Sequence, residues 1–112
     1  MIIDFKNKEY CISNIDFLKK YKNELNLNWE SISYNQKLNE KFIREFQNEV
    51  DWFYISCDQK LSEDFIREFK DKINFSKISY HQKLSEKFIR EFKDEVNWDW
   101  ILLNQILSED FI

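Results

Sequence analysis

A twelve-residue motif occurs three times, with few changes, in this chain of 112 residues, and its spacing constrains the fold more than any other feature. It reads QKLNEKFIREFQ from Gln36, QKLSEDFIREFK from Gln59 and QKLSEKFIREFK from Gln82, so that successive copies begin 23 residues apart. No insertion interrupts this step from residue 35 onward. A fixed short period is typical of folds in which one supersecondary unit stacks on the next.

The same step relates apolar and aromatic positions, which we predict to form the structural core of each repeat. Within one copy, Phe65, Ile66, Phe69 and Ile73 fall at offsets typical of a single apolar helix stripe. Across the copies, the predicted core residues are Leu38, Leu61 and Leu84; Phe42, Phe65 and Phe88; Phe46, Phe69 and Phe92; Trp52, Phe75 and Trp98; Ile55, Ile78 and Ile101.

Each repeat is predicted to hold two short helices. The N-cap residues expected for the first helix are Asn39, Ser62, Ser85 and Ser108. Those expected for the second are Asp51, Asn74 and Asn97. Because Asn and Asp tolerate the left-handed conformation and the chain has no glycine, we expect the second helix to end in that conformation near Asn35, Asp58, His81 and Asn104.

A single repeat cannot fold alone. Its roughly seven buried side chains contribute on the order of 10 to 20 kcal/mol, whereas ordering its residues costs roughly 35 kcal/mol. Neighbouring copies must therefore cover each other's apolar faces. The sequence predicts an all-α, solenoid-like stack of short helix pairs repeating every 23 residues, with a diverged N-terminal cap.

We expect residues 1–112 to form one helical-repeat domain. Residues 13–34 are interpreted as a diverged repeat in which FLKKYKNELN parallels FIREFQNEVD, with Leu27 and Asn28 as an insertion. The expected parts are an N-terminal cap segment 1–12, the diverged repeat 13–34, regular repeats 35–57, 58–80 and 81–103, and a partial repeat or C-terminal cap 104–112.

The pattern Q-x-L-S-E-x-F-I, followed by F and then by V-D/N-W-x-x-I-S, resembles short helical repeats in uncharacterised proteins of large DNA viruses, phages and low-GC bacteria. The resemblance covers residues 35–112 well and 13–34 loosely. It implies a helical stack and a viral or mobile-element source, and it brings no catalytic or ligand-binding residue with it.

Composition and charge narrow the classes of function. The chain lacks both Gly and Pro, so a glycine-rich phosphate-binding loop is excluded. A net charge of -4 opposes binding to nucleic acid and to anionic membranes. No apolar run suggests a secretion signal or a membrane span, so we expect a cytoplasmic protein, in the host cytoplasm if the source is viral.

Residues with catalytic chemistry do not form a recognisable site, and we expect a protein that is not an enzyme and needs no cofactor or metal. His81 is interpreted as a residue of a surface connection, and Cys57 as a small buried hydrophobe. The recurring glutamates after each cap suit the helix dipole and solubility. The recurring arginines Arg44, Arg67 and Arg90 are each followed by a glutamate, which favours stacked ion pairs over a phosphate-binding row.

The most informative positions are those that differ between near-identical copies. They follow the aromatic residue that starts each second helix, and free positions on a common face are where repeat proteins carry specificity. The candidate partner-binding residues are Phe53, Tyr54, Lys77, Asp99 and Trp100.

Three hypotheses follow for the function. The first is a non-enzymatic module that binds a protein partner, as a viral or phage factor engaging a host protein would. The second is an acidic inhibitor that blocks a nucleic-acid-binding site by charge mimicry. The third is a structural protein that forms homo-oligomers through the open ends of the stack.

Overall fold

The computed structural model describes residues 15–21, 23 and 27–105, without the side chain of Phe17. This part of the chain holds eight helices and no strand, which confirms the all-α prediction. The helices are α2 (Ile15–Tyr21), α3 (Trp29–Asn35), α4 (Glu40–Glu45), α5 (Trp52–Asp58), α6 (Glu63–Glu68), α7 (Phe75–His81), α8 (Glu86–Glu91) and α9 (Trp98–Asn104). The predicted cap segment 1–12, Cys11, the cap Ser108 and most of the segment 104–112 lie outside the described residues.

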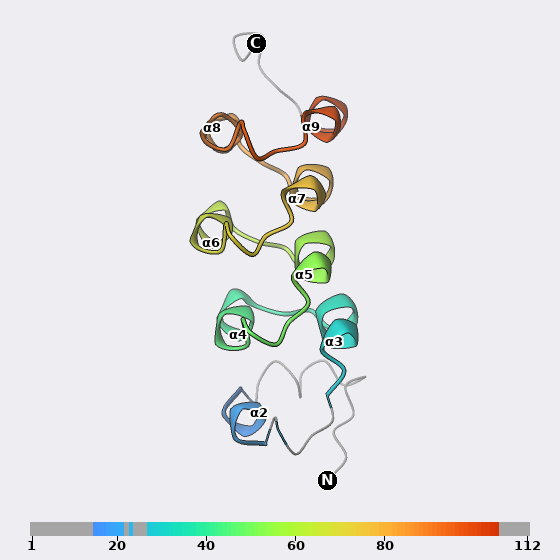
Figure 1. The fold of residues 1–112 in the computed structure, drawn as a ribbon, viewed down its shortest axis with the longest axis vertical. Helices are drawn as coiled ribbons and strands as arrows, with labels where there is room; N and C mark the ends of the chain where they lie inside the picture. Colours follow the sequence, from blue (N-terminus) through green and yellow to red (C-terminus); the bar gives the residue numbers. More distant parts are fainter. Residues whose placement is uncertain (1–14, 22, 24–26, 106–112) are drawn as a thin grey trace.

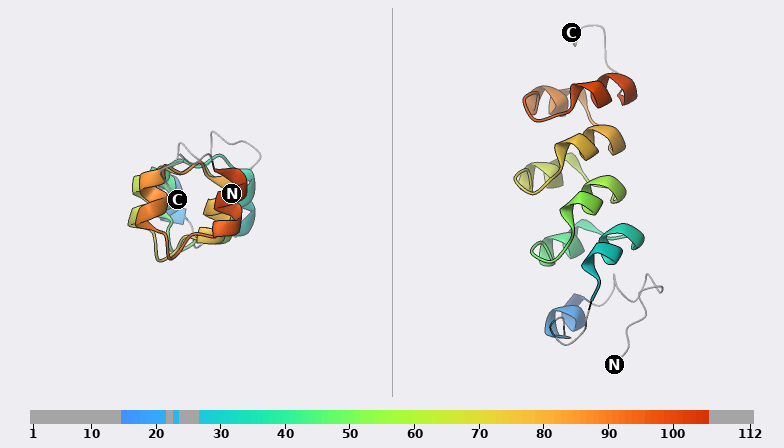
Figure 2. Two further views of the ribbon diagram at one scale, coloured as in Figure 1. Left: turned by 90° about the horizontal axis from the view of Figure 1, so that it is seen from above. Right: turned by 45° about the vertical axis from the view of Figure 1, so that its right-hand side comes forward.

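The helices lie in two columns, as Figure 1 shows, with α3, α5, α7 and α9 in one and α2, α4, α6 and α8 in the other. Within the first column, α3 contacts α5, α5 contacts α7, and α7 contacts α9. Seen from above in Figure 2, the connections between the columns lie along two opposite edges. The molecule measures 56 × 22 × 18 Å, so it is long in the direction of the columns.

The predicted N-caps are confirmed wherever the structure describes them. Asn39, Ser62 and Ser85 accept a hydrogen bond from a backbone N–H of the first turn that follows. Asp51, Asn74 and Asn97 do the same for the second helices. Because isolated helices of six or seven residues are unstable in water, these caps and the packing between helices must hold them.

The alignment of the diverged repeat needs a correction. Asn28 is the N-cap of α3 and accepts from the N–H of Ser31, as Asp51 caps α5. Leu27 packs against the core immediately before this cap, the place that Val50 occupies in the next copy. Leu27 and Asn28 are therefore the counterparts of Val50 and Asp51, and the two extra residues precede them.

The second helices end at Asn35, Asp58, His81 and Asn104, as predicted, but the expected left-handed conformation is wrong. No residue of the described segments has positive φ. Instead, the chain leaves each helix through an extended glutamine, such as Gln59 with φ -96° and ψ 142°. Its N–H still bonds to the carbonyl of Ile55, so the last turn closes without a left-handed residue.

The apolar positions of the repeat form one continuous hydrophobic core. Every predicted leucine, isoleucine and phenylalanine of the core is buried except Phe75, which with Trp52 is partly buried against it. Phe42, Phe65 and Phe88 are 0 to 1% exposed, and each packs on the phenylalanine that caps the C-terminus of its helix, at ring-centroid distances of 4.6 to 4.8 Å. These three residues therefore share their burial and one phenylalanine neighbour.

The prediction is wrong for Trp98, which is 37% exposed. The ring centroid of its counterpart Trp52 lies 6.3 Å from that of Phe65 in α6 and 5.2 Å from that of Phe69, the C-cap of α6. The residue corresponding to Phe65 for Trp98 is Phe111, which lies outside the described residues. Trp98 therefore lacks, among the described residues, the pair of rings that covers Trp52.

Two rows of buried polar side chains join successive copies. Gln59 Nε2 donates to the carbonyl oxygens of Ser33 and Gln36 at 2.9 and 2.7 Å, and its Oε1 accepts from the N–H of Leu38 at 2.9 Å. Gln82 and Gln105 make the corresponding bonds one and two copies further on. Each glutamine thus satisfies three backbone groups in the last turn of the preceding second helix and in the connection after it, groups that would be costly to bury unpaired.

The second row consists of serines inside the second helices. Ser56 is fully buried; its hydroxyl donates to the carbonyl of Trp52 at 2.7 Å and accepts from the N–H of Asn74 at 3.0 Å. Ser33 and Ser79 make the same pair of bonds with their own neighbours. The row ties the start of each second helix to the one before it.

Candidate protein-interaction surface

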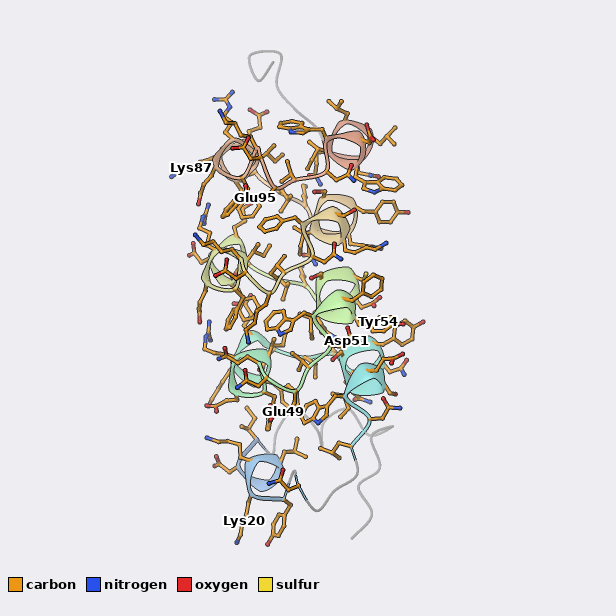
Figure 3. The ribbon with its side chains drawn as sticks, viewed as in Figure 1. Lys20, Glu49, Asp51, Tyr54, Lys87 and Glu95 are labelled. Carbon is orange, nitrogen blue, oxygen red and sulfur yellow. The ribbon has the colours of Figure 1, made fainter. Side chains whose placement is uncertain are left out.

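The outer side of the α3, α5, α7 and α9 column carries exposed aromatic side chains. In α5, Ile55 and Ser56 face the core, so the second, third and sixth residues of the helix face outward. Figure 3 shows Tyr54 projecting from this outer side. The corresponding positions in the four helices supply what we call the aromatic face, which consists of Tyr34, Phe53, Tyr54, Tyr80 and Trp100.

One cluster of the aromatic face spans α3, α5 and α7. Tyr34 meets Tyr54 edge-on with ring centroids 5.3 Å apart, and Phe53 meets Tyr54 in the same manner at 5.2 Å. The ammonium group of Lys77 lies 5.3 Å from the centroid of the Phe53 ring. Edge-to-face ring pairs and cation–π contacts hold side chains in fixed positions, so this cluster presents a preorganised surface.

A second cluster joins α7 and α9. Tyr80 meets Trp100 edge-on at 4.6 Å and His81 at 4.4 Å. Leu102 and Leu103 of α9 are also exposed. Tyr34, Phe53, Tyr80 and Trp100 are each 36 to 55% exposed, although aromatic side chains of this size are usually covered. Such side chains are enriched at the centres of protein interfaces.

The charges around the aromatic face are modest and mixed. The carboxylate of Glu30, followed by partial burial and by Asp51, raises the pKa of the Tyr54 hydroxyl. Burial, with a smaller contribution from Asp58, raises the pKa of the Cys57 thiol, which lies half-buried on α5. Tyr54 and Cys57 are therefore neutral at pH 7, and the face offers apolar rings with hydroxyl groups at their rims.

The predicted partner-binding residues are only partly brought together. Phe53, Tyr54 and Lys77 contact one another or share a neighbour in the first cluster, whereas Trp100 lies in the second. Asp99 is exposed on the first turn of α9. Tyr34 and Tyr80 were not among the predicted residues, because the residue type at their helix position differs less between the copies. Their spacing of three residues from Ser31 and Lys77 would have placed them on the same face.

The first helices present a different surface, made of ion pairs between copies. Arg44 binds both oxygens of Glu68, each at 2.9 Å, and Arg67 binds Glu91 at 3.0 Å. The predicted arginine–carboxylate row is therefore confirmed for these two pairs. The guanidinium groups of Arg44 and Arg67 also lie 5.5 and 5.3 Å from the rings of Phe65 and Phe88.

The glutamates that follow the caps do more than the sequence suggested. Glu40 accepts from both the N–H and the hydroxyl of Ser62, at 2.7 and 3.0 Å. Glu63 binds Ser85 in the same way at 2.7 and 2.8 Å. Their expected role in solubility is thus incomplete, since both carboxylates bind the cap of the next copy.

We expect the Arg44–Glu68 pair to make the stability depend on acid pH. Hydrogen bonds from Arg44 hold the pKa of Glu68 below its usual value, so the folded protein releases this proton more readily than the unfolded chain does. The stabilisation is therefore complete above the unfolded-state pKa of about 4.3 and disappears as pH falls through the lower folded-state value.

The measurement is urea denaturation at a series of pH values from neutral to strongly acidic. The parent protein should lose more stability over this range than Glu68→Gln does, and Arg44→Gln should reduce the acid loss in the same way. An unchanged acid loss in Glu68→Gln would show that the pair does not contribute.

Other kinds of site find no support in the part of the chain that the structure describes. No cluster of His, Cys, Asp or Glu there is arranged to hold a metal ion. None of the described helices combines the length and the apolar character needed to cross a membrane. His81 is exposed, at the end of α7, as predicted for a residue of a surface connection. Comparisons with protein-family models, curated proteins and solved structures found no match.

Proposed function

We propose that this chain is a solenoid of 23-residue helix pairs that acts as a non-enzymatic protein-binding module, with the aromatic face as its binding surface. The solenoid is supported by the hydrogen bonds of Gln59, Gln82 and Gln105, which each reach a carbonyl 23 residues earlier. In this proposal the cytoplasm, of the host if the source is viral, is the place of action.

The observation that carries the binding role is the exposure of preorganised aromatic rings along one side of one column. The core is filled by other residues, so the rings of Phe53, Tyr80 and Trp100 are not needed to complete it. Their contacts with one another restrict their rotamers before a partner arrives, and less conformational entropy is then lost on binding. Exposed, rigid aromatic side chains are the anchors typical of interface hot spots.

The test is affinity capture from a lysate of the source cell, or of its host, followed by measurement of the affinity for the captured protein. Phe53→Ala, Tyr54→Ala and Trp100→Ala together should weaken binding at least tenfold, because each hot-spot truncation costs more than about 1 kcal/mol. The matched control replaces Lys41, Lys70 and Lys87 with alanine on the other column, and it should bind like the parent.

Three results would contradict the proposal. Equal binding by both variants would show that the aromatic face is not the surface used. Binding that survives the aromatic substitutions but falls steeply with salt would favour an acidic inhibitor acting by charge mimicry. Loss of the helical circular dichroism signal would show that the rings support the fold instead.

Self-association is a second candidate function, favoured by the apolar side chains of α9. Trp98, Leu102 and Leu103 are all exposed on this last described helix. Open ends of helical stacks associate unless they are covered. Light scattering over a concentration series decides this candidate: a rising mass supports it, and a constant monomer mass removes it.

A further inference from the structure

A second surface runs along the edge where each second helix is connected to the next first helix. Three hollows lie there in succession, with volumes of about 430, 420 and 330 Å³. Adjoining hollows share the residues that separate them: Lys60 borders the first two and Lys83 the last two. The hollows therefore form one stepped channel, which we call the lysine groove.

The lysine groove is basic although the chain as a whole has a net charge of -4. Its lining includes Lys37, Lys60 and Lys83, one from each copy, and a single carboxylate, that of Asp58. The ion pairs of the described residues involve none of these three lysines. Since all three lysines are exposed, the groove offers a regular row of cations to an anionic ligand.

The spacing of the lysines along the groove indicates which conformation a bound peptide would have. Helices packed side by side lie about 8–10 Å apart, and α3, α5 and α7 are in contact one after another. Successive lysines should therefore repeat at about this step. A peptide in the polyproline II conformation has three residues per turn and rises about 9.3 Å in that distance. Every third side chain of such a peptide then returns to the same side with a matching spacing.

We infer that the lysine groove binds an acidic peptide in the polyproline II conformation, with a carboxylate at every third residue opposite Lys37, Lys60 and Lys83. Tyr34 and Tyr80 border the first and last hollows and supply the aromatic walls against which such peptides pack. This inference does not require the aromatic face to bind a partner, although the two tyrosines border both surfaces.

A nucleic-acid strand fits the groove less well. Its phosphates carry a charge at every nucleotide, and the acidic remainder of the chain repels so dense a polyanion. A peptide with one carboxylate per three residues places negative charge only opposite the lysines of the groove. The peptide is therefore the ligand that the charges favour.

The test uses fluorescence anisotropy at low ionic strength with a labelled peptide of four Glu-Pro-Pro triplets. A second peptide of the same composition has its glutamates gathered at one end. We expect the 112-residue chain to bind the first peptide about fivefold more tightly, because only that peptide pairs several carboxylates with lysines at once.

Substitutions in the groove test the contact directly. Lys37→Gln, Lys60→Gln and Lys83→Gln together should weaken binding about tenfold, since each exposed ion pair contributes a few-fold. Lys41→Gln, Lys70→Gln and Lys87→Gln change the net charge equally, but these lysines lie outside the groove, so binding should change less than twofold. Asp58→Asn should tighten binding about twofold, because it removes the carboxylate of the groove.

Four outcomes would overturn the inference. They are equal affinity for the two peptides, no binding of either peptide, an equal loss in the two triple variants, and tighter binding of oligothymidylate that the groove substitutions abolish. The last result would assign the groove to nucleic acid. Circular dichroism of each variant, compared with the parent, keeps loss of folding separate from loss of binding.

Discussion

Gln59→Leu is expected to lower the free energy of unfolding by about 3 kcal/mol or more, because it leaves three buried backbone groups without partners, each costing about 1–3 kcal/mol. The groups are the carbonyls of Ser33 and Gln36 and the N–H of Leu38, all bound by the Gln59 amide at 2.7 to 2.9 Å. Leucine has a similar volume but can neither donate nor accept.

Urea denaturation followed by circular dichroism measures this effect. Gln47→Leu is the matched control, since Gln47 is half-buried and donates one bond, to the exposed carbonyl of Arg44. That change should cost less than about 1 kcal/mol, because water can replace the bond. If the two substitutions cost the same, the buried glutamine row does not hold the copies together.

Phe65→Ala should be comparably damaging, with an expected loss of about 3–5 kcal/mol in the free energy of unfolding. Phe65 is 1% exposed and packs against Phe69, the C-cap of its helix, and against Trp52 of α5. The guanidinium of Arg44 lies near its ring. Its truncation therefore opens a cavity where two copies meet. No neighbouring side chain can fill a phenyl-sized space without leaving its own contacts.

Phe53→Ala is the control, because it removes the same atoms from a side chain that is 44% exposed. Its cost should stay below about 1 kcal/mol, as surface substitutions usually do. A loss for Phe65→Ala as small as that for Phe53→Ala would contradict the position of Phe65 in the shared core.

The sequence predicts the helices of this fold well because apolar spacing and caps are local signals. Ser62 and Asp51 begin helices where they were expected, and Phe42, Phe65 and Phe88 are buried as their period indicated. The left-handed helix ends were predicted wrongly. Local propensity favoured Asn and Asp there, but the extended glutamine that follows closes the helix and uses its side chain across the copies.

Contacts between different copies could not be predicted from local sequence patterns. Glu40 and Ser62 are 22 residues apart, and they meet only in the folded chain. The burial of Ser56 and Gln59 runs against the usual exposure of such residues, so only their recurrence between copies was a signal. Trp98 is the opposite case, because the repeat predicted burial and the residue is exposed. The rings of Phe65 and Phe69, which cover Trp52, have no counterpart at Trp98 among the described residues.

The same reasoning explains how much of the candidate surface was found. Variation between copies pointed to Phe53, Tyr54 and Trp100, and two of these three are exposed. Tyr34 and Tyr80 were missed, although their spacing of three residues from Ser31 and Lys77 was a signal that placed them on the same face. The lysine groove could not be predicted, because each of its hollows is lined by residues of two connections that lie far apart in the sequence.

Small-angle X-ray scattering of the chain, and of a variant with one further copy of residues 58–80 inserted after residue 80, tests the stacked arrangement most directly. The parent should give a radius of gyration near 16.1 Å, against about 13 Å for a compact globule of this length. The insertion should lengthen the particle by about 8–10 Å and leave its cross-section unchanged. A parent value near that of the globule, or an insertion that enlarges the particle equally in all directions, would contradict the stack.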